Sequence, residues 1–99
     1  MTVQLLINEA AQKEWKRAAA WYEVKQTGLG DRFVSTVKVK LESISRYPER
    51  YPKRKGNFRE ASVGIFPYNI VYTFYEKEGI ITVTSIFHTS RNPAYKYKK

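Results

Sequence analysis

Four side chains in the second half of the chain are of types that can act on a phosphodiester. His88 is the only histidine, and the other three are Arg59, Arg91 and Tyr95. A histidine titrates near neutral pH and can serve as an acid or a base, and an arginine can hold a phosphate through two parallel hydrogen bonds. These residues could therefore supply the base, the positive charge and the acid of metal-free RNA cleavage, in which the 2′-hydroxyl is the internal nucleophile.

Two of these residues, His88 and Arg91, also have a structural interpretation. We favour a structural role for His88, in which it ends a strand, hydrogen-bonds the tail and holds Arg91 in place. A single histidine with no visible acidic residue to orient it is weak support for catalysis. Arg91 and Pro93 either anchor the tail or act at a site, and the sequence leaves both roles open.

The composition predicts a small protein without a cofactor. The chain has no cysteine, a single histidine and no glycine-rich phosphate loop, so we expect neither a metal site nor a nucleotide cofactor. The lack of cysteine fits a reducing cytosol, and no signal peptide or membrane span is apparent, so a cytoplasmic location is expected. Residues 1–99 are expected to form one domain.

Positive charge is concentrated in the second half of the chain. Residues 1–49 carry eight lysines and arginines against six acidic residues, whereas residues 50–99 carry ten against three. Such asymmetry indicates a polyanionic partner, either nucleic acid or an acidic protein, although the net charge of +9 could serve solubility alone. The candidate residues for binding nucleic acid or another target are Lys53, Arg54, Lys55, Arg59 and Arg91. For the first three, a solvated turn is the alternative.

A β-hairpin between Phe66 and Arg91 is the element that must position these groups. Its predicted arms, Tyr68–Tyr75 and Ile80–His88, are rich in aromatic and β-branched residues and are separated by Glu76–Gly79. At period two, one face of the first arm carries Tyr68, Ile70, Tyr72 and Phe74. On the second arm, the same period places Ile80 and Ile86 on one face and Ile81, Val83 and Phe87 on the other. Both faces are apolar, which predicts a central strand covered on both sides.

Two helices are expected before the hairpin. The first runs from Glu9 to about Gln26, with Asn8 as its N-cap and Gly28 as the residue that ends it. The second follows a short turn and ends at Tyr47, before a proline. Their apolar stripes consist of Ala11, Trp15, Ala18 and Tyr22 in the first, and of Phe33, Val37, Leu41 and Ile44 in the second. Trp21 is also interpreted as a core residue.

The predicted fold is α+β, in the order β-α-α-β-β-β. A short strand at Val3–Ile7 precedes the helices, and a strand from about Phe58 to Ile65 follows the basic connection of residues 46–59. The two antiparallel helices must cover an apolar surface, and the sheet is the only candidate. We therefore expect a helical hairpin on one face of a mostly antiparallel, four-stranded sheet.

A set of short motifs matches one protein family in order and spacing. The motifs are Trp21-Tyr22, Gly28-Leu29-Gly30-x-x-Phe33, Tyr47-Pro48-x-x-Tyr51-Pro52, Arg59, Phe66-Pro67-Tyr68-x-Ile70-x-Tyr72 and His88-x-x-Arg91-x-Pro93. With these motifs the chain resembles, over nearly its whole length, the RelE/ParE superfamily of toxins from bacterial type II toxin–antitoxin pairs. The Phe-Pro-Tyr strand and the His-x-x-Arg-x-Pro ending are closer to the ParE branch.

The resemblance implies growth inhibition and plasmid stabilisation by one of two activities. ParE-like proteins poison DNA gyrase by binding it, whereas RelE-like proteins cut messenger RNA in the ribosome. In RelE-like enzymes, basic residues on the sheet and a tyrosine near the C-terminus act on the RNA, and Arg59, Arg91 and Tyr95 occupy comparable places here. ParE-like tails commonly carry tryptophan where this chain has Tyr95.

The resemblance also implies an antitoxin. We expect a small partner, acidic in its C-terminal half, that wraps the toxin as an amphipathic helix and an extended segment. The basic half of the chain would attract it, and the eight tyrosines are too many to be all core. Tyr47, Tyr51, Tyr95 and Tyr97 flank basic residues, as exposed aromatic residues do in interfaces.

Overall fold

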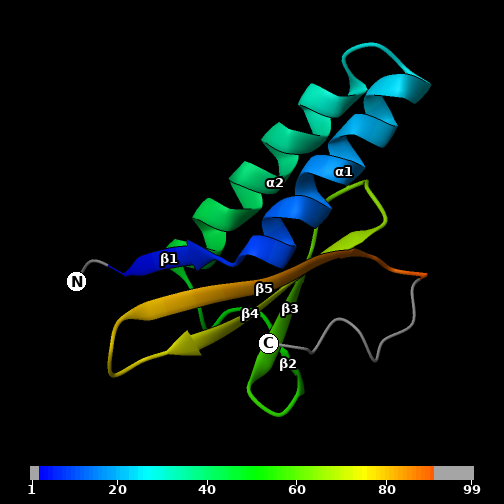
Figure 1. The fold of residues 1–99 in the computed structure, drawn as a ribbon. Helices are drawn as coiled ribbons and strands as arrows, with labels where there is room; N and C mark the ends of the chain where they lie inside the picture. Colours follow the sequence, from blue (N-terminus) through cyan, green and yellow to red (C-terminus); the bar gives the residue numbers. More distant parts are fainter. Residues whose placement is uncertain (1–2, 91–99) are drawn as a thin grey trace.

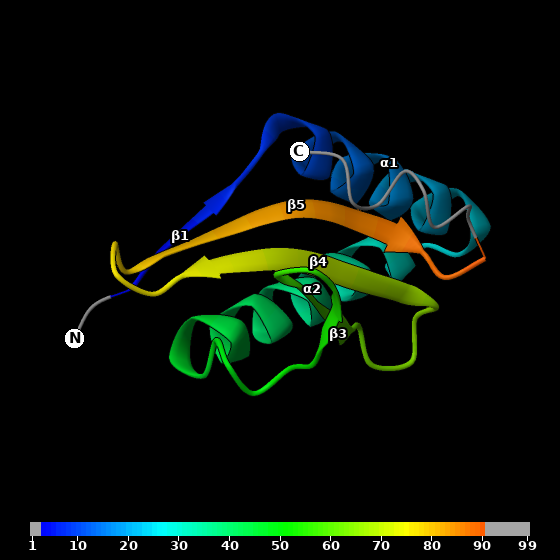
Figure 2. The ribbon, with the colours of Figure 1, turned by 90° about the horizontal axis from the view of Figure 1, so that it is seen from below.

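The chain folds into two helices packed on one face of a five-stranded sheet (Figure 1). The computed structural model describes residues 3–90. Its elements are β1 (Gln4–Ile7), α1 (Glu9–Lys25), α2 (Leu29–Arg46), β2 (Lys53–Lys55), β3 (Phe58–Ser62), β4 (Tyr68–Tyr75) and β5 (Ile80–His88). Figure 2, seen from below, shows β4 and β5 side by side across the two helices. The predicted α+β class and the helical hairpin are confirmed.

The sheet has one strand more than predicted. Its order is β1-β5-β4-β3-β2, and β1 with β5 is its parallel pair. The prediction of four strands missed β2, in which three exposed cations pair with β3. A strand made of cations has no apolar pattern to reveal it, because its pairing depends on the backbone alone. The strand predicted to reach Ile65 ends at Ser62.

The core lies between the helices and the hairpin β4–β5. The predicted stripe of α2 is buried throughout, and Ala11, Ala18 and Tyr22 of α1 are buried with it. At one end the rings of Tyr22, Phe33, Phe66 and Tyr68 form a cluster with centroids 5.0–6.2 Å apart. Rings at such distances add about 0.5–1.5 kcal/mol per pair beyond the area that they bury.

A β-bulge at Thr84 changes which residues of β5 share a face. Val71 pairs with Ser85 whereas Tyr72 pairs with Val83, so Thr84 is an extra residue. Because of it, Ile86 faces the helices together with Ile81 and Val83, with Ile70, Phe74 and Tyr72 as their partners on β4. The predicted grouping of Ile86 with Ile80 is therefore wrong. Residues on both faces of β5 are buried, as predicted, including Phe87 on the face away from the helices.

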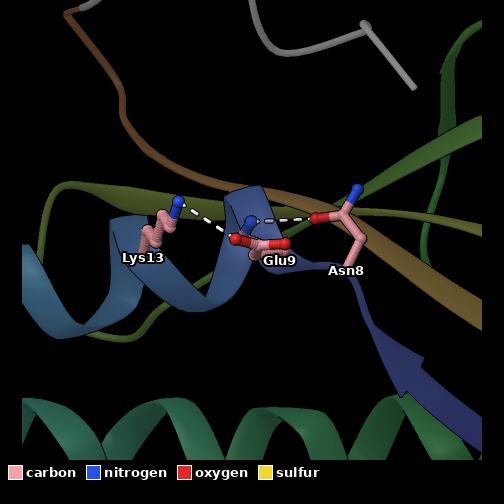
Figure 3. Close-up of polar contacts among 4 residues, drawn as sticks. Asn8, Glu9 and Lys13 are labelled. Atoms are coloured by element: carbon pink, nitrogen blue, oxygen red, sulfur yellow. Dashed lines mark hydrogen bonds and ion pairs between the residues drawn. The ribbon is translucent and has the colours of Figure 1, made fainter.

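The start of α1 is fixed by the predicted N-cap. The side-chain oxygen of Asn8 accepts a hydrogen bond of 2.8 Å from the backbone N–H of Ala11 (Figure 3). Glu9 forms an ion pair of 3.0 Å with Lys13, also drawn in Figure 3. Both side chains of this pair are largely exposed, so it adds little stability. The cap therefore determines where β1 gives way to α1.

Glu14 completes the hydrogen bonding of β5 where β1 ends. The parallel pairing reaches only Val83, so the outer edge of β5 beyond it needs another partner. One carboxylate oxygen of Glu14 accepts a hydrogen bond of 3.0 Å from the backbone N–H of Ile86 and another of 3.0 Å from the hydroxyl of Ser85. A side chain of α1 thus continues the edge that the short strand β1 leaves open.

The turn between the helices depends on Glu23 and two glycines. The carboxylate of Glu23 accepts hydrogen bonds from the backbone N–H groups of Gly28, at 2.9 Å, and Gly30, at 3.0 Å. Gly28 has a φ of 90°, which suits glycine, and it is the N-cap of α2. The prediction that Gly28 ends α1 is therefore corrected, since Gln26 is the C-cap of that helix.

We predict that Gly30→Ala destabilises the protein. A Cβ at this position would lie 2.6 Å from the backbone oxygen of Ala19, so the two helices would have to move apart. Such overpacking costs about 1–3 kcal/mol, more than the gain of up to about 1 kcal/mol from helix propensity. Equilibrium unfolding in urea measures the net effect.

Ser35→Ala is the matched control for this prediction, because Ser35 is exposed on the same helix. Its free energy of unfolding is expected to stay within about 0.5 kcal/mol of the wild type. A Gly30→Ala variant as stable as the wild type, or more so, would contradict the close approach of the two helices.

Candidate functional site

The predicted site residues fall into different parts of the molecule. Arg59 lies in β3, and His88 is the last residue of β5. Arg91 and Tyr95 lie outside the described residues 3–90. The structure therefore allows a comparison of Arg59 with His88.

The strand register separates Arg59 from His88. Arg59 pairs with Tyr72 of β4, and His88 pairs with Tyr68 of the same strand. Four residues of an extended strand span about 13 Å. Groups that act on one phosphodiester must lie within hydrogen-bond reach of its reacting atoms. The register does not bring these two residues to one such point.

Arg59 holds the connection between α2 and β2. Its Nη1 donates a hydrogen bond of 2.6 Å to the carbonyl oxygen of Tyr51 and a longer one of 3.3 Å to that of Glu49. From the neighbouring strand, the hydroxyl of Tyr72 donates a hydrogen bond of 2.6 Å to the carbonyl oxygen of Pro48. Side chains of the sheet thus fix the path of the connection by hydrogen bonds to the carbonyl groups of the connection.

Tyr72 is fully buried, and burial raises its pKa to about 12 in spite of the nearby charge of Arg59. Its phenol therefore stays protonated, and able to donate to Pro48, over the whole physiological pH range. When this phenol loses its proton at alkaline pH, it can no longer donate to Pro48, and the connection becomes less stable.

His88 makes its contacts within the turn that it precedes. Its Nδ1 accepts a hydrogen bond of 3.1 Å from the backbone N–H of Ser90 and lies 2.7 Å from the hydroxyl of the same residue. The ring of Tyr68 meets the imidazole edge-on at 5.3 Å. Among residues 3–90 no carboxylate hydrogen-bonds this imidazole. These contacts suit a structural role for His88, and the predicted contact with Arg91 lies outside the described residues.

An open groove of about 490 Å³ lies between α1 and the end of the hairpin. Aromatic and apolar side chains line most of it, with Arg17, His88 and Ser90 among the polar ones. Trp21 on its wall is 56% exposed, and the ammonium group of Lys25 lies 5.0 Å from its ring centre. The interpretation of Trp21 as a core residue is therefore wrong, because Trp21 lies beside the buried stripe that passes through Tyr22.

The basic candidates Lys53, Arg54 and Lys55 form the exposed edge strand β2. They lie on the surface, next to the connection that Arg59 holds, in the register Lys53 opposite Arg59. Residues 3–90 contain no group of three histidines, cysteines or acidic residues that could hold a metal ion. Neither helix of this part of the chain is long and apolar enough to cross a membrane.

Comparison with protein families gives one match that spans most of the chain. A family model described as the ParE toxin of the type II toxin–antitoxin system parDE matches residues 5–93. No curated protein sequence matches the chain.

Solved structures of several toxins share the fold. The free E. coli toxin RelE, in a mutant form, superposes with a TM-score of 0.68 at 22% identity, over 91% of this chain and 86% of that one. The chromosomal ParDE system of P. aeruginosa gives a TM-score of 0.64 at 13% identity, over 90% and 98%. The toxin–antitoxin complex RelBE2 of Mycobacterium tuberculosis gives 0.61 at 14% identity, over 89% and 99%.

Tyr72→Phe is expected to weaken the protein at neutral pH and to reduce the loss of stability at high pH. At neutral pH the variant lacks the hydrogen bond to Pro48, which is worth about 1 kcal/mol. A tyrosine in the unfolded chain loses its proton near pH 10.0, whereas Tyr72 in the folded protein keeps it to about 12. Wild-type stability must therefore fall as the pH rises through this range, and the variant lacks this contribution.

Urea unfolding at several pH values between neutrality and 12 measures the effect. Tyr75→Phe, at an exposed position, is the control. If the free energy of unfolding falls equally with pH above 10 in the wild type and in Tyr72→Phe, the role of burial at Tyr72 is contradicted.

Proposed function

Since the chain belongs to the ParE toxin family of type II toxin–antitoxin systems, we propose that it arrests growth by binding DNA gyrase in the cytoplasm. The family match spans residues 5–93, which includes both helices and all of the sheet except Gln4, the first residue of β1. The fold alone does not distinguish the two activities of the superfamily, because RelE and ParE toxins share it.

The separation of Arg59 from His88 is the observation that favours binding over cleavage. Each of the two side chains makes hydrogen bonds that stabilise its own surroundings, Arg59 with the connection and His88 with the turn after β5. A nuclease needs its acid, base and cations to converge on one phosphate. A toxin that acts by binding has no such requirement.

Ribosome-dependent cleavage of messenger RNA is the alternative. The fold, which the chain shares with RelE at a TM-score of 0.68, is compatible with it. The groups that would act are Arg59, His88, Arg91 and Tyr95. Position-specific cuts in ribosome-bound messages, detected by primer extension and abolished by Arg59→Ala and Arg91→Ala, would favour this activity over gyrase inhibition.

A gyrase assay with the wild type and His88→Asn tests the proposal. We expect the purified protein to inhibit supercoiling or to trap a cleaved gyrase–DNA complex. The amide oxygen of asparagine can accept the hydrogen bond that Ser90 gives to Nδ1, so the variant should keep its activity. We expect a change of about twofold at most, whereas loss of an acid or base costs about 10²–10⁴-fold.

Two results would contradict the proposal. One is that expression of the wild-type protein stops growth, while the purified protein leaves gyrase unaffected at the concentration reached in those cells. The other is a loss of growth arrest in His88→Asn while circular dichroism shows the variant to be folded, since this would indicate that His88 takes part in catalysis.

An acidic antitoxin is the partner that the charge distribution favours. The similar structures ParDE and RelBE2 are toxin–antitoxin systems. Residues 50–99 carry most of the excess positive charge, and the groove beside Trp21 offers apolar area with Arg17 on its lining. An amphipathic helix with an acidic face could cover both kinds of surface. A disordered partner of this kind is open to proteolysis until it folds on the toxin.

The affinity for the antitoxin encoded by the neighbouring reading frame is expected to fall as salt rises, because salt screens exposed charges. Calorimetric titration at low and high salt measures it. An affinity that does not change with salt, or a complex that leaves Lys53–Arg59 exposed, would contradict the electrostatic part of this proposal.

A further inference from the structure

A cluster of polar and cationic side chains surrounds the phenol of Tyr51 at the C-terminal end of α2. The hydroxyl of Tyr51 lies 2.8 Å from that of Ser43. Nη1 of Arg50 lies 3.5 Å from the same Ser43 oxygen, and Nζ of Lys40 lies 5.3 Å from the centre of the Tyr51 ring. Two cations and two hydroxyl groups therefore surround one small region of the surface.

An exposed aromatic ring adjoins this cluster. Tyr47 is 52% exposed, although it is a large apolar side chain. The guanidinium carbon of Arg50 lies 4.2 Å from the centre of its ring, a separation typical of stacking. Arg50 thus joins Tyr47 to Ser43 and Tyr51 in one continuous surface.

The positive charge of this surface is not neutralised within the described residues. No carboxylate in residues 3–90 forms an ion pair with Lys40 or Arg50. Burial alone would raise the pKa of Tyr51. The Ser43 hydrogen bond, the charge of Lys40 and hydrogen bonding by Arg50 and Lys40 together hold that pKa below its ordinary value. A negative charge on or near the phenol is therefore stabilised.

The backbone beneath the cluster is held firmly. Arg59 bonds the carbonyl oxygen of Tyr51 itself, at 2.6 Å, and Tyr72 bonds that of Pro48. The hydroxyl groups of Ser43 and Tyr51 and the ring of Tyr51 are thus positioned before any ligand binds, which lowers the conformational entropy lost on binding.

We propose that Lys40, Ser43, Tyr47, Arg50 and Tyr51 form a binding site for single-stranded nucleic acid. Lys40 and Arg50 supply the charge for one phosphate. Of the two hydroxyl groups of Ser43 and Tyr51, one donates to the other, and the one that accepts this bond donates its own hydrogen to a phosphate oxygen. A base stacks on the surface made by Tyr47 and Arg50. This activity goes beyond gyrase or antitoxin binding and does not depend on either.

The composition of the site favours nucleic acid over an acidic peptide. Aromatic rings interleaved with cations are the usual construction of surfaces that bind single strands, because each base offers a flat face for stacking. A peptide carboxylate could use the charges and the hydroxyl donors, but it offers no flat face to stack on the ring of Tyr47. The exposed cationic strand β2 begins two residues after Tyr51, so a strand bound at the cluster can continue along it.

Fluorescence anisotropy with a labelled single-stranded oligothymidylate tests the site in the full chain. Lys40→Ala should weaken binding and reduce the slope of log affinity against log salt by about 0.7, the value for one lost phosphate contact on a single strand. Lys38→Ala, an exposed position on the same helix with the same change of charge, should leave the slope unchanged. Tyr47→Ala should weaken binding about fivefold or more, and Tyr75→Ala should not.

A second measurement detects occupation of the site in the wild type. The bound phosphate neutralises the cations, so the pKa of Tyr51 should rise when the oligonucleotide is added, as followed by the absorbance of tyrosinate and assigned with Tyr51→Phe. This measurement requires no variant of Lys40 or Tyr47, so it also tests the site if those variants do not fold.

Five outcomes would overturn the proposal, four of them in the experiments with the oligonucleotide. These four are equal effects of Lys38→Ala and Lys40→Ala, an unchanged pKa of Tyr51, binding of a duplex as tight as that of the single strand, and displacement of the oligonucleotide by polyglutamate at equal charge. The last would identify the surface as one for acidic proteins. Binding of inorganic phosphate without any binding of the oligonucleotide would equally contradict it.

Discussion

The burial of one face of the β4–β5 hairpin beneath the two helices is the constraint on which the rest of the structure depends. Three irregular features of the fold make this burial possible. The extra residue Thr84 returns the second half of β5 to the buried face. Glu14 closes the strand edge under α1, and Gly30 lets α2 approach α1 closely enough to share the same core.

The same packing decides what the charged residues of the sheet can do. Arg59 and His88 have the chemistry of a nuclease, but the register fixes each in its own surroundings. Arg59 stabilises the connection after α2 by bonding its carbonyl groups. By doing so it shapes a surface that contains other cations. Residues that look catalytic in the sequence can thus act by positioning a neighbouring site.

Much of the fold could be predicted because the spacing of apolar residues along a helix or strand indicates which of its faces is buried. The helical stripe through Phe33 and Val37 and the alternation along β4 have one arrangement that buries them together. The bulge at Thr84 could not be predicted, because no glycine or proline marks it. The strand β2 could not either, since its three cations pair only through their backbone.

The candidate site was harder to predict than the fold. The residue types were informative at Arg59 and His88, but the direction of each side chain depends on the register and on local hydrogen bonds. The cluster around Tyr51 requires the connection to fold back on α2, so that Ser43 and Tyr51, eight positions apart, meet. No periodic pattern of apolar residues predicts that the chain folds back on α2 in this way.

The parallel pair β1–β5 has a consequence for the order of events during synthesis. Gln4 of β1 pairs with Ile80 of β5, so β1 finds its partner only when the last strand of the described residues has been made. Until then the helical hairpin lacks β5, one of the two central strands against which its apolar stripes pack. Contacts so distant in sequence form late in folding. The complete sheet, and with it the groove between α1 and the end of the hairpin, therefore forms only after β5 has left the ribosome.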